Sequence, residues 1–413
     1  MPKGFYFLIG AQFASGLADN ALIILGIYFL DEQGYPGWWA PLLKFSLTFS
    51  YVALASVLGP IADAFPKHHL MAWMNGLKMC GIFLLLLGAQ PLIAYLVIGL
   101  AASLYAPSKY GLMTESVPSQ LLIRANAWLE VTMVLSVVLG IALGGALTML
   151  SASGHSVTRF IHGKLEFLPF IETQTLTALL ILLLVYLVAS ILNIGLSQLQ
   201  AKNNFLPLSW RVLQLHSFWK SNLQLWRDPL GGLSLYVTTL YWGVGAVLQF
   251  AVLTWSQQTL GLLLQQGALL QALVAIGVIG GAIWAGHHIR LYFARDTLPW
   301  GLVLAALLPV IVQISSLWLA VPLLLVVGFC GGVLMVSMNA LLQRRGMRVL
   351  STGRSIAVQG FNENLSVLLM LASYSALLAF EVPLFNVMVI LAILLLAGIL
   401  PLCIKRGRYY RWR

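Results

Sequence analysis

The chain has 413 residues, of which 60% are hydrophobic and only 8% are charged, and its mean hydropathy is +0.91. Soluble proteins carry about 25% charged residues, so this composition excludes a soluble globular protein and leaves no room for a separate soluble domain. The net charge of +11 does not indicate nucleic-acid binding, because the basic residues lie between apolar runs, where membrane topology explains them.

Apolar segments of spanning length follow one another along the chain. About 20 residues of helix cross a hydrocarbon layer of ~30 Å, so each segment predicts a transmembrane helix. The first is too long for a signal peptide and is expected to be retained. The sequence therefore predicts an all-α membrane protein with twelve spans, at about 5–30, 38–64, 70–89, 91–115, 121–150, 173–196, 230–259, 267–287, 297–316, 319–343, 351–380 and 383–404.

The connections on one side of these spans hold most of the Lys and Arg, whereas the other side has little beyond Arg159 and Lys164. The positive-inside rule therefore predicts that both termini are cytoplasmic. The longest cytoplasmic connection, 197–229, is basic and rich in tryptophan, which predicts a partly interfacial amphipathic segment. It separates a six-helix half, 1–196, from a second half with a basic tail, 230–413. Polar groups at equivalent places in two pseudo-symmetric halves resemble the layout of a major facilitator fold.

Asp19 and Asn20 lie in the first apolar segment, with Asp19 about 21 Å from its start and so near the membrane middle. A carboxylate at that depth costs about 2.5–3.5 kcal/mol if it faces lipid, so Asp19 is expected to face a protein interior or a wet cavity. The alternative is that both side chains only bond neighbouring helices and hold the bundle together.

Further polar side chains interrupt the apolar segments at similar depths. Lipid exposure of Asp19 and four other ionisable residues would cost about 15 kcal/mol together, as much as the whole stability of a typical protein. We therefore expect these residues to converge on one polar interior between the halves, as a substrate head-group site or as purely structural ion pairs. Besides Asp19 and Asn20, the candidate substrate-binding residues are Lys78, Lys109, Tyr110, Arg124, Asn126, Glu130, Trp242, Glu363 and Asn364.

Gly59 and Asp63 precede a short charged turn and resemble the cytoplasmic signature of major facilitators. Glycine permits close helix approach, and Asp63 can accept hydrogen bonds from the start of a helix headed by Ser351 or Thr352. This predicts a conformational switch at Gly59 and Asp63. The alternative is an ordinary charged turn, because the usual Arg two residues after the Asp is absent and only Lys67 follows.

No nucleotide-binding loop, metal-ligand spacing or nucleophile–base pair stands out in the sequence. Cys80, Cys330 and Cys403 lie in apolar segments at unrelated spacings and predict neither disulfides nor a metal site. We therefore expect no cofactor and no catalytic residue, and transport is favoured over enzymatic chemistry. Glycines at 328, 331 and 332 predict a helix-packing face.

Several stretches, from the first span to the eleventh, together resemble the lysophospholipid transporter family of Gram-negative bacteria, a branch of the major facilitators. They include Ala18-Asp19-Asn20-Ala21, Asn75-Gly76-Leu77-Lys78, Ser108-Lys109-Tyr110-Gly111, Ala125-Asn126 with Glu130, Tyr241-Trp242-Gly243, Asn339-Ala340-Leu341-Leu342-Gln343 and Glu363-Asn364. Of these, the Ser108-Lys109-Tyr110-Gly111 and Glu363-Asn364 blocks are specific.

The resemblance implies a flippase-like carrier in the bacterial inner membrane that works without an ion gradient. It implies movement of lysophosphatidylethanolamine and lysophosphatidylglycerol from the outer to the inner leaflet, where an acyltransferase/acyl-carrier-protein synthetase reacylates them. Asp19 corresponds to the family's acid on the first helix. Gln249 stands where a basic residue is expected on the seventh helix, which departs from the family pattern and predicts altered head-group preference.

We expect a monomer. The main rival is a proton-coupled major facilitator that exports amphipathic drugs, with Asp19 or Glu363 as its proton site. A rival from another class is a membrane-embedded lipid-modifying enzyme. Loss of lysolipid uptake on collapse of a proton gradient would favour the exporter, and chemically altered substrate would favour the enzyme.

Overall fold

The computed structural model describes residues 1–35, 39–152, 173–198, 207–262 and 264–404, and helices account for nearly all of them. Three short 3-10 helices, η1 (Ser119–Leu121), η2 (Gly195–Gln198) and η3 (Leu291–Thr297), join longer elements. The α-helices are α1 (Lys3–Glu32), α2 (Trp39–Ala53), α3 (Ala55–Ala64), α4 (Lys67–Leu86), α5 (Pro91–Ser116), α6 (Leu122–Ala152), α8 (Thr173–Ile194), α9 (Trp210–Leu213), α10 (Leu215–Arg227), α11 (Pro229–Gln258), α12 (Leu264–His288), α13 (Leu298–Ile311), α14 (Leu317–Val349), α15 (Thr352–Ala379) and α16 (Leu384–Ile404).

Among the described residues, ten helices are long and apolar enough to cross a membrane, or eleven when α2 and α3 count as one bent span. The predicted all-α membrane protein is confirmed. The predicted count of twelve is reached only with α15, which coincides with the predicted span 351–380. The hydropathy of α15 is lowered by Arg354, Glu363 and neighbouring amides, and these side chains make many of the polar contacts described below.

The predicted second span is not one straight helix. It breaks at Leu54, and its two parts meet at an angle of 72°. Pro60 lies inside α3, where it cannot donate the usual helical hydrogen bond. The break makes α3 a separate ten-residue helix that carries both Gly59 and Asp63.

The described chain forms two compact units, and three helices, α6, α10 and α15, contribute to both. Unit 1 consists of residues 1–117, 135–219 and 351–358, and unit 2 of residues 118–134, 220–350 and 359–413. The first turns of α6 therefore belong to unit 2, and the first turns of α15 belong to unit 1. The division at 197–229 into two six-helix halves stays a prediction.

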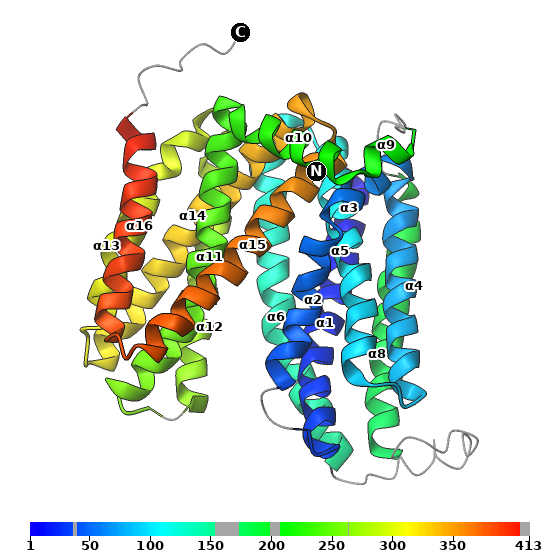
Figure 1. The fold of residues 1–413 in the computed structure, drawn as a ribbon, viewed down its shortest axis with the longest axis horizontal. Helices are drawn as coiled ribbons and strands as arrows, with labels where there is room; N and C mark the ends of the chain where they lie inside the picture. The colour runs from blue at the N-terminus through cyan, green and yellow to red at the C-terminus, as the bar shows by residue number, and fades with distance from the viewer. Residues whose placement is uncertain (36–38, 153–172, 199–206, 263, 405–413) are drawn as a thin grey trace. The chain divides into compact units, whose positions relative to one another are not determined.

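In unit 1, α4 packs against α5 and α8, and α1 packs against α8 (Figure 1). The core between them is apolar and includes Leu22, Leu25 and Leu179, each essentially inaccessible. Tyr95 from α5 is also buried there, and its hydroxyl donates to the carbonyl of Leu22. This packing fixes the facing sides of α1, α4 and α8, which carry the ion pair and hydrogen bonds around Asp19.

In unit 2, α12 and α14 form the most extensive helix pair, and α13 packs against α16 (Figure 1). A Cβ at Gly328 would overlap the carbonyl of Val274, and one at Gly281 would overlap the carbonyl of Phe329. Only glycine allows backbones to approach this closely. The packing face predicted at residues 328–332 is therefore present, and residues 330–343 of α14 are buried.

Candidate functional site

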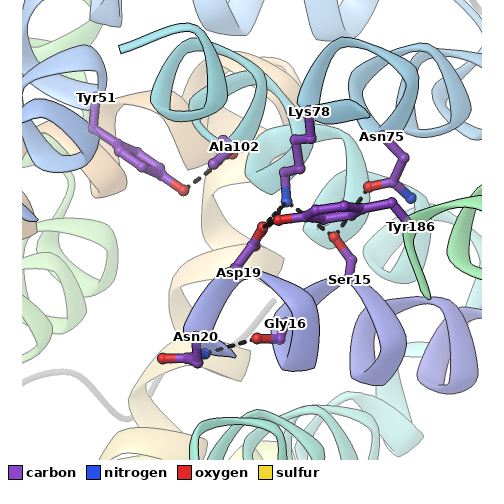
Figure 2. A network of polar contacts seen from close by, with 9 residues as sticks. All are labelled: Ser15, Gly16, Asp19, Asn20, Tyr51, Asn75, Lys78, Ala102 and Tyr186. Atoms are coloured by element: carbon purple, nitrogen blue, oxygen red, sulfur yellow. Dashed lines mark hydrogen bonds and ion pairs between the residues drawn. The ribbon is translucent and has the colours of Figure 1, made fainter. Parts of the chain in front are cut away.

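A buried ion pair joins Asp19 on α1 to Lys78 on α4 within unit 1 (Figure 2). The Nζ atom of Lys78 lies 2.8 Å from Oδ1 and 2.7 Å from Oδ2 of Asp19. Lys78 is 1% exposed, whereas the Asp19 side chain is 30% exposed. Burial of an unpaired ammonium in a membrane protein is costly, so this pairing explains how the chain tolerates Lys78 at such depth.

Polar and aromatic side chains from four helices surround this pair. The Tyr186 hydroxyl on α8 donates to Oδ1 of Asp19 at 2.6 Å. Ser15 Oγ accepts from Lys78 at 2.9 Å and donates to Asn75 Oδ1 at 3.0 Å. The Lys78 ammonium also lies 5.1 Å from the Tyr105 ring centre and 5.5 Å from that of Tyr186, within cation–π range. We call Ser15, Asp19, Asn75, Lys78 and Tyr186 the Asp19 cluster.

The other predicted residues of unit 1 lie outside this network. Asn20 donates to the Gly16 carbonyl of its own helix at 2.8 Å. Lys109 is buried on α5, with Nζ 4.3 Å from the ring centre of Tyr110, the next residue. An ammonium held against an aromatic face keeps its charge at modest cost, so Lys109 is a candidate for binding an anionic group.

A second set of buried polar side chains lies in unit 2. Asn126 on α6 and Gln343 on α14 form a reciprocal amide pair, with donor–acceptor distances of 2.8 and 3.0 Å. On α15, Gln359 donates to Glu363 Oε1 and to Asn339 Oδ1 of α14, both at 2.8 Å. The buried Glu130 carboxylate is close enough to Glu363 to act on it electrostatically.

Three further candidates of unit 2 take different positions. Arg124 is exposed at the start of α6, where that helix packs against Gly286 of α12. Asn364 donates to the Gly360 carbonyl of its own helix at 2.8 Å. Trp242 on α11 has a buried indole Nε1 with no hydrogen-bond partner among the described residues. A buried donor left without a partner is costly, so Trp242 Nε1 is open to a polar ligand atom.

The contact predicted between Asp63 and the start of a helix headed by Ser351 is present in unit 1. Asp63 Oδ1 accepts from the backbone N–H of Gly353 at 2.7 Å, and Oδ2 accepts from that of Arg354 at 3.2 Å and from the Ser351 hydroxyl. A Cβ on Gly59 would lie 2.6 Å from the Cα of Arg354, so only glycine fits there. The carboxylate thus caps the helix N-terminus, where the dipole favours an anion. The switching role of Gly59 and Asp63 stays a prediction.

An ion pair that the sequence did not reveal ties α11 to α14 in unit 2. Asp228 caps α11 by accepting from the N–H groups of Leu230 and Gly231. It also accepts from Arg345 Nε at 3.0 Å and Nη2 at 2.5 Å. Burial alone raises the pKa of Asp228, but the Arg345 guanidinium and the backbone donors outweigh it and hold that pKa below its usual range.

The predicted site residues thus form two sets. Unit 1 contains Asp19, Lys78 and Lys109, and unit 2 contains Asn126, Glu130 and Glu363. The expected ion pairing is present for Asp19 and Lys78, but the single polar chamber between the halves stays a prediction. Sequence reasoning missed Tyr186, whose one signal is a lone phenol in an apolar run, and Gln343, which pairs with an amide 217 residues away.

A sequence model of the Major Facilitator Superfamily matches residues 8–369. A relative from Yersinia enterocolitica named lysophospholipid transporter LplT is 32% identical over 385 residues, covering 93% of this chain and 89% of its own. A Yersinia pestis relative of the same name is 33% identical, covering 90% of this chain and 86% of its own. The chain belongs to the lysophospholipid transporter family of the major facilitator superfamily.

The fold of this family member is also that of a solved transporter. The crystal structure of FucP, a major facilitator in the outward conformation, matches with a TM-score of 0.77 at 13% identity and covers 98% of this chain and 99% of its own. That identity is low, so the likeness extends to the fold alone. The family resemblance predicted from the sequence is confirmed, and so is the major facilitator fold.

Gln249, which the sequence resemblance places where a basic residue is expected, lies on α11. Its side chain is exposed and neutral, and its backbone carbonyl accepts from Gln271 of α12 at 2.7 Å. The residue that holds a positive charge against Asp19 in this family member is therefore Lys78 of α4.

Proposed function

We propose that this chain is a flippase-like carrier that moves lysophospholipids from the outer to the inner leaflet of a bacterial inner membrane. The observation that carries the proposal is the identity of 32–33% to proteins named lysophospholipid transporter, extending over nine-tenths of the chain. The substrates proposed are lysophosphatidylethanolamine and lysophosphatidylglycerol, each with one acyl chain and a charged head group.

The polar residues of each unit supply the chemistry that such a head group needs. A phosphate pairs well with a cationic side chain, and an ammonium pairs well with a carboxylate. We assign the phosphate to Lys109 or Arg124 and an ethanolamine ammonium to Asp19 or Glu130. Asp19 suits this role because 30% of its side chain is accessible. Apolar helix faces then accommodate the acyl chain.

Transport by alternating access needs a contact that forms in one state and breaks in another. We propose that the capping of α15 by Asp63 is such a contact and that the halves 1–196 and 230–413 are the moving lobes. We propose that transport runs down the lysolipid gradient alone, without coupling to an ion gradient.

The proposed membrane topology follows from the positive-inside rule, with both termini and the connection 197–229 in the cytoplasm. This orientation delivers lysolipid to the leaflet where a peripheral acyltransferase/acyl-carrier-protein synthetase reacylates it. We propose that this enzyme is a functional partner and that the carrier acts as a monomer.

Reconstitution of the purified protein tests the proposal. Proteoliposomes receive fluorescent lysolipids with ethanolamine, glycerol or choline head groups, and movement is followed by protection from a membrane-impermeant quencher. We expect protein-dependent movement of unaltered lysolipid that persists when a proton gradient is collapsed with an ionophore. Transport that stops with the gradient would favour a proton-coupled exporter of amphipathic drugs, and recovery of chemically altered lipid would favour an enzyme.

A further inference from the structure

All three hydrogen-bond donors of the Lys78 ammonium are used within unit 1. An ammonium donates three hydrogen bonds, and Lys78 makes three, to Oδ1 and Oδ2 of Asp19 and to Ser15 Oγ. Its side chain is 1% exposed, and two tyrosine rings flank it. Lys78 therefore has no donor left for a substrate phosphate, and its charge acts on Asp19.

The Asp19 carboxylate still has hydrogen-bond acceptor capacity. A carboxylate accepts about four hydrogen bonds, and Asp19 accepts three in this structure, two from Lys78 and one from Tyr186. With 30% of its side chain accessible, Asp19 can meet a further donor while Lys78 remains in place. The pair is thus a neutral unit in which the Asp19 side chain is partly accessible and Lys78 is not.

We propose that Lys78 is the fixed counter-ion of Asp19 and that it sets the head-group charge preference of the carrier. The inference rests on the proposed function and assigns Lys78 a specificity role in it. Every lysophospholipid brings a phosphate, and a lone carboxylate would repel it. With Lys78 present, the site presents no net charge, so a head group without an amine is accepted alongside one that carries an amine.

The size of the effect follows from Coulomb's law. Two unit charges about 8–10 Å apart in a protein interior change a binding equilibrium by about tenfold or more. Removal of the Lys78 charge penalises the glycerol head group, whose net charge is negative. It spares the ethanolamine head group, whose own ammonium takes the place of Lys78 against Asp19. The preference for ethanolamine over glycerol therefore rises.

Head-group binding to purified protein tests this role, measured as displacement of a fluorescent lysolipid by lysophosphatidylethanolamine and by lysophosphatidylglycerol. Lys78→Met removes the charge and keeps the chain length, and we expect the affinity ratio of ethanolamine to glycerol forms to rise about tenfold or more. Asp19→Asn leaves Lys78 uncompensated, and its ratio should move in the opposite direction. Lys220→Met, at an exposed lysine of α10, is the matched control and should keep the wild-type ratio.

An unchanged ratio in folded Lys78→Met protein, or a shift toward the glycerol form, overturns the inference. If Lys78→Met does not yield monodisperse protein, the Asp19→Asn ratio decides, because an unchanged ratio there contradicts a charge-balanced site. Wild-type protein that binds and moves no lysolipid refutes the proposed function itself. Wild-type binding with no change of ratio in either variant refutes only the role of Lys78.

Discussion

Replacing Asp63 with Asn should undock the first turns of α15 from α3. The Asp63 carboxylate is 5% exposed and takes donors from three residues at the start of α15, namely Ser351, Gly353 and Arg354. Asn offers one acceptor oxygen and turns an NH₂ group toward the remaining donors. The variant therefore keeps one contact and loses the charge that the helix dipole favours.

Hydrogen bonds to a charged group contribute about 1.5–3 kcal/mol each to stability. Loss of two at the low end of this range weakens the docking of α15 by about 3 kcal/mol, which is a factor of about a hundred in the docking equilibrium. The close approach of Gly59 to Arg354 adds no compensating contact, because it depends on the same docking.

Cysteine accessibility measures this equilibrium. Ser355 lies in the docked turns of α15 and is 2% exposed, so Ser355→Cys reports undocking once the native Cys80, Cys330 and Cys403 are replaced by Ala. We expect Asp63→Asn to raise the rate of maleimide labelling at that position by one to two orders of magnitude. Asp31→Asn, at an exposed carboxylate, is the control. Equal labelling rates with and without Asp63→Asn would refute the role of Asp63 in docking α15.

Three further outcomes are expected. Asp19→Asn should abolish lysolipid transport while membrane insertion and yield stay normal, and wild-type rates in that variant would make Asp19 structural. Tyr186→Phe keeps the ring beside Lys78 but loses the 2.6 Å bond to Asp19, so the apparent substrate affinity should fall about tenfold, as measured by initial transport rates. The lowered pKa of Asp228 means that its pair with Arg345 stabilises the fold above an unfolded-state pKa of about 3.9 and loses that contribution as pH falls through the lower folded-state value. The difference in Tm between wild type and Asp228→Asn should therefore be constant from about pH 7 to 5 and shrink below about pH 4; a difference that changes between pH 7 and 5 would contradict this assignment.

The helices of this fold follow from apolar length, but their breaks and ends do not. The second span breaks at Leu54, where the local sequence has neither Gly nor Pro, so tertiary packing of α2 on α5 sets that bend. The span predicted at 319–343 continues as helix to Val349, because Arg344, Arg345 and Arg348 end the apolar run without ending the helix. Hydropathy predicts which residues lie in the membrane, but it does not predict where the backbone hydrogen bonds of a helix begin, break or end.

Charge gave the clearest signals for the candidate site. The energetic cost of Asp19 and Lys78 in apolar segments predicted that they would lie in a protein interior, paired or hydrated, and the structure shows them paired with each other. Neutral partners have no comparable energetic cost in an apolar segment. The Tyr186 ring is compatible with an apolar helix, and an amide such as Gln343 is ordinary near the end of a span. Spacing along one helix shows which residues share a face, whereas it does not reveal the partner on another helix.

Because of the break at Leu54, the packing against α5 and the contact with α15 are made by two separate helices, α2 and α3, and not by one continuous helix. In a straight span, any tilt at one end is transmitted along the whole length, so a change at the acid that holds α15 would disturb the packing of α2 on α5. Because the helix is interrupted at Leu54, α3 can change its orientation while α2 keeps its packing against α5. For the switching role that we propose for Asp63, the break leaves the ten-residue helix α3 as the part expected to move when α15 is released.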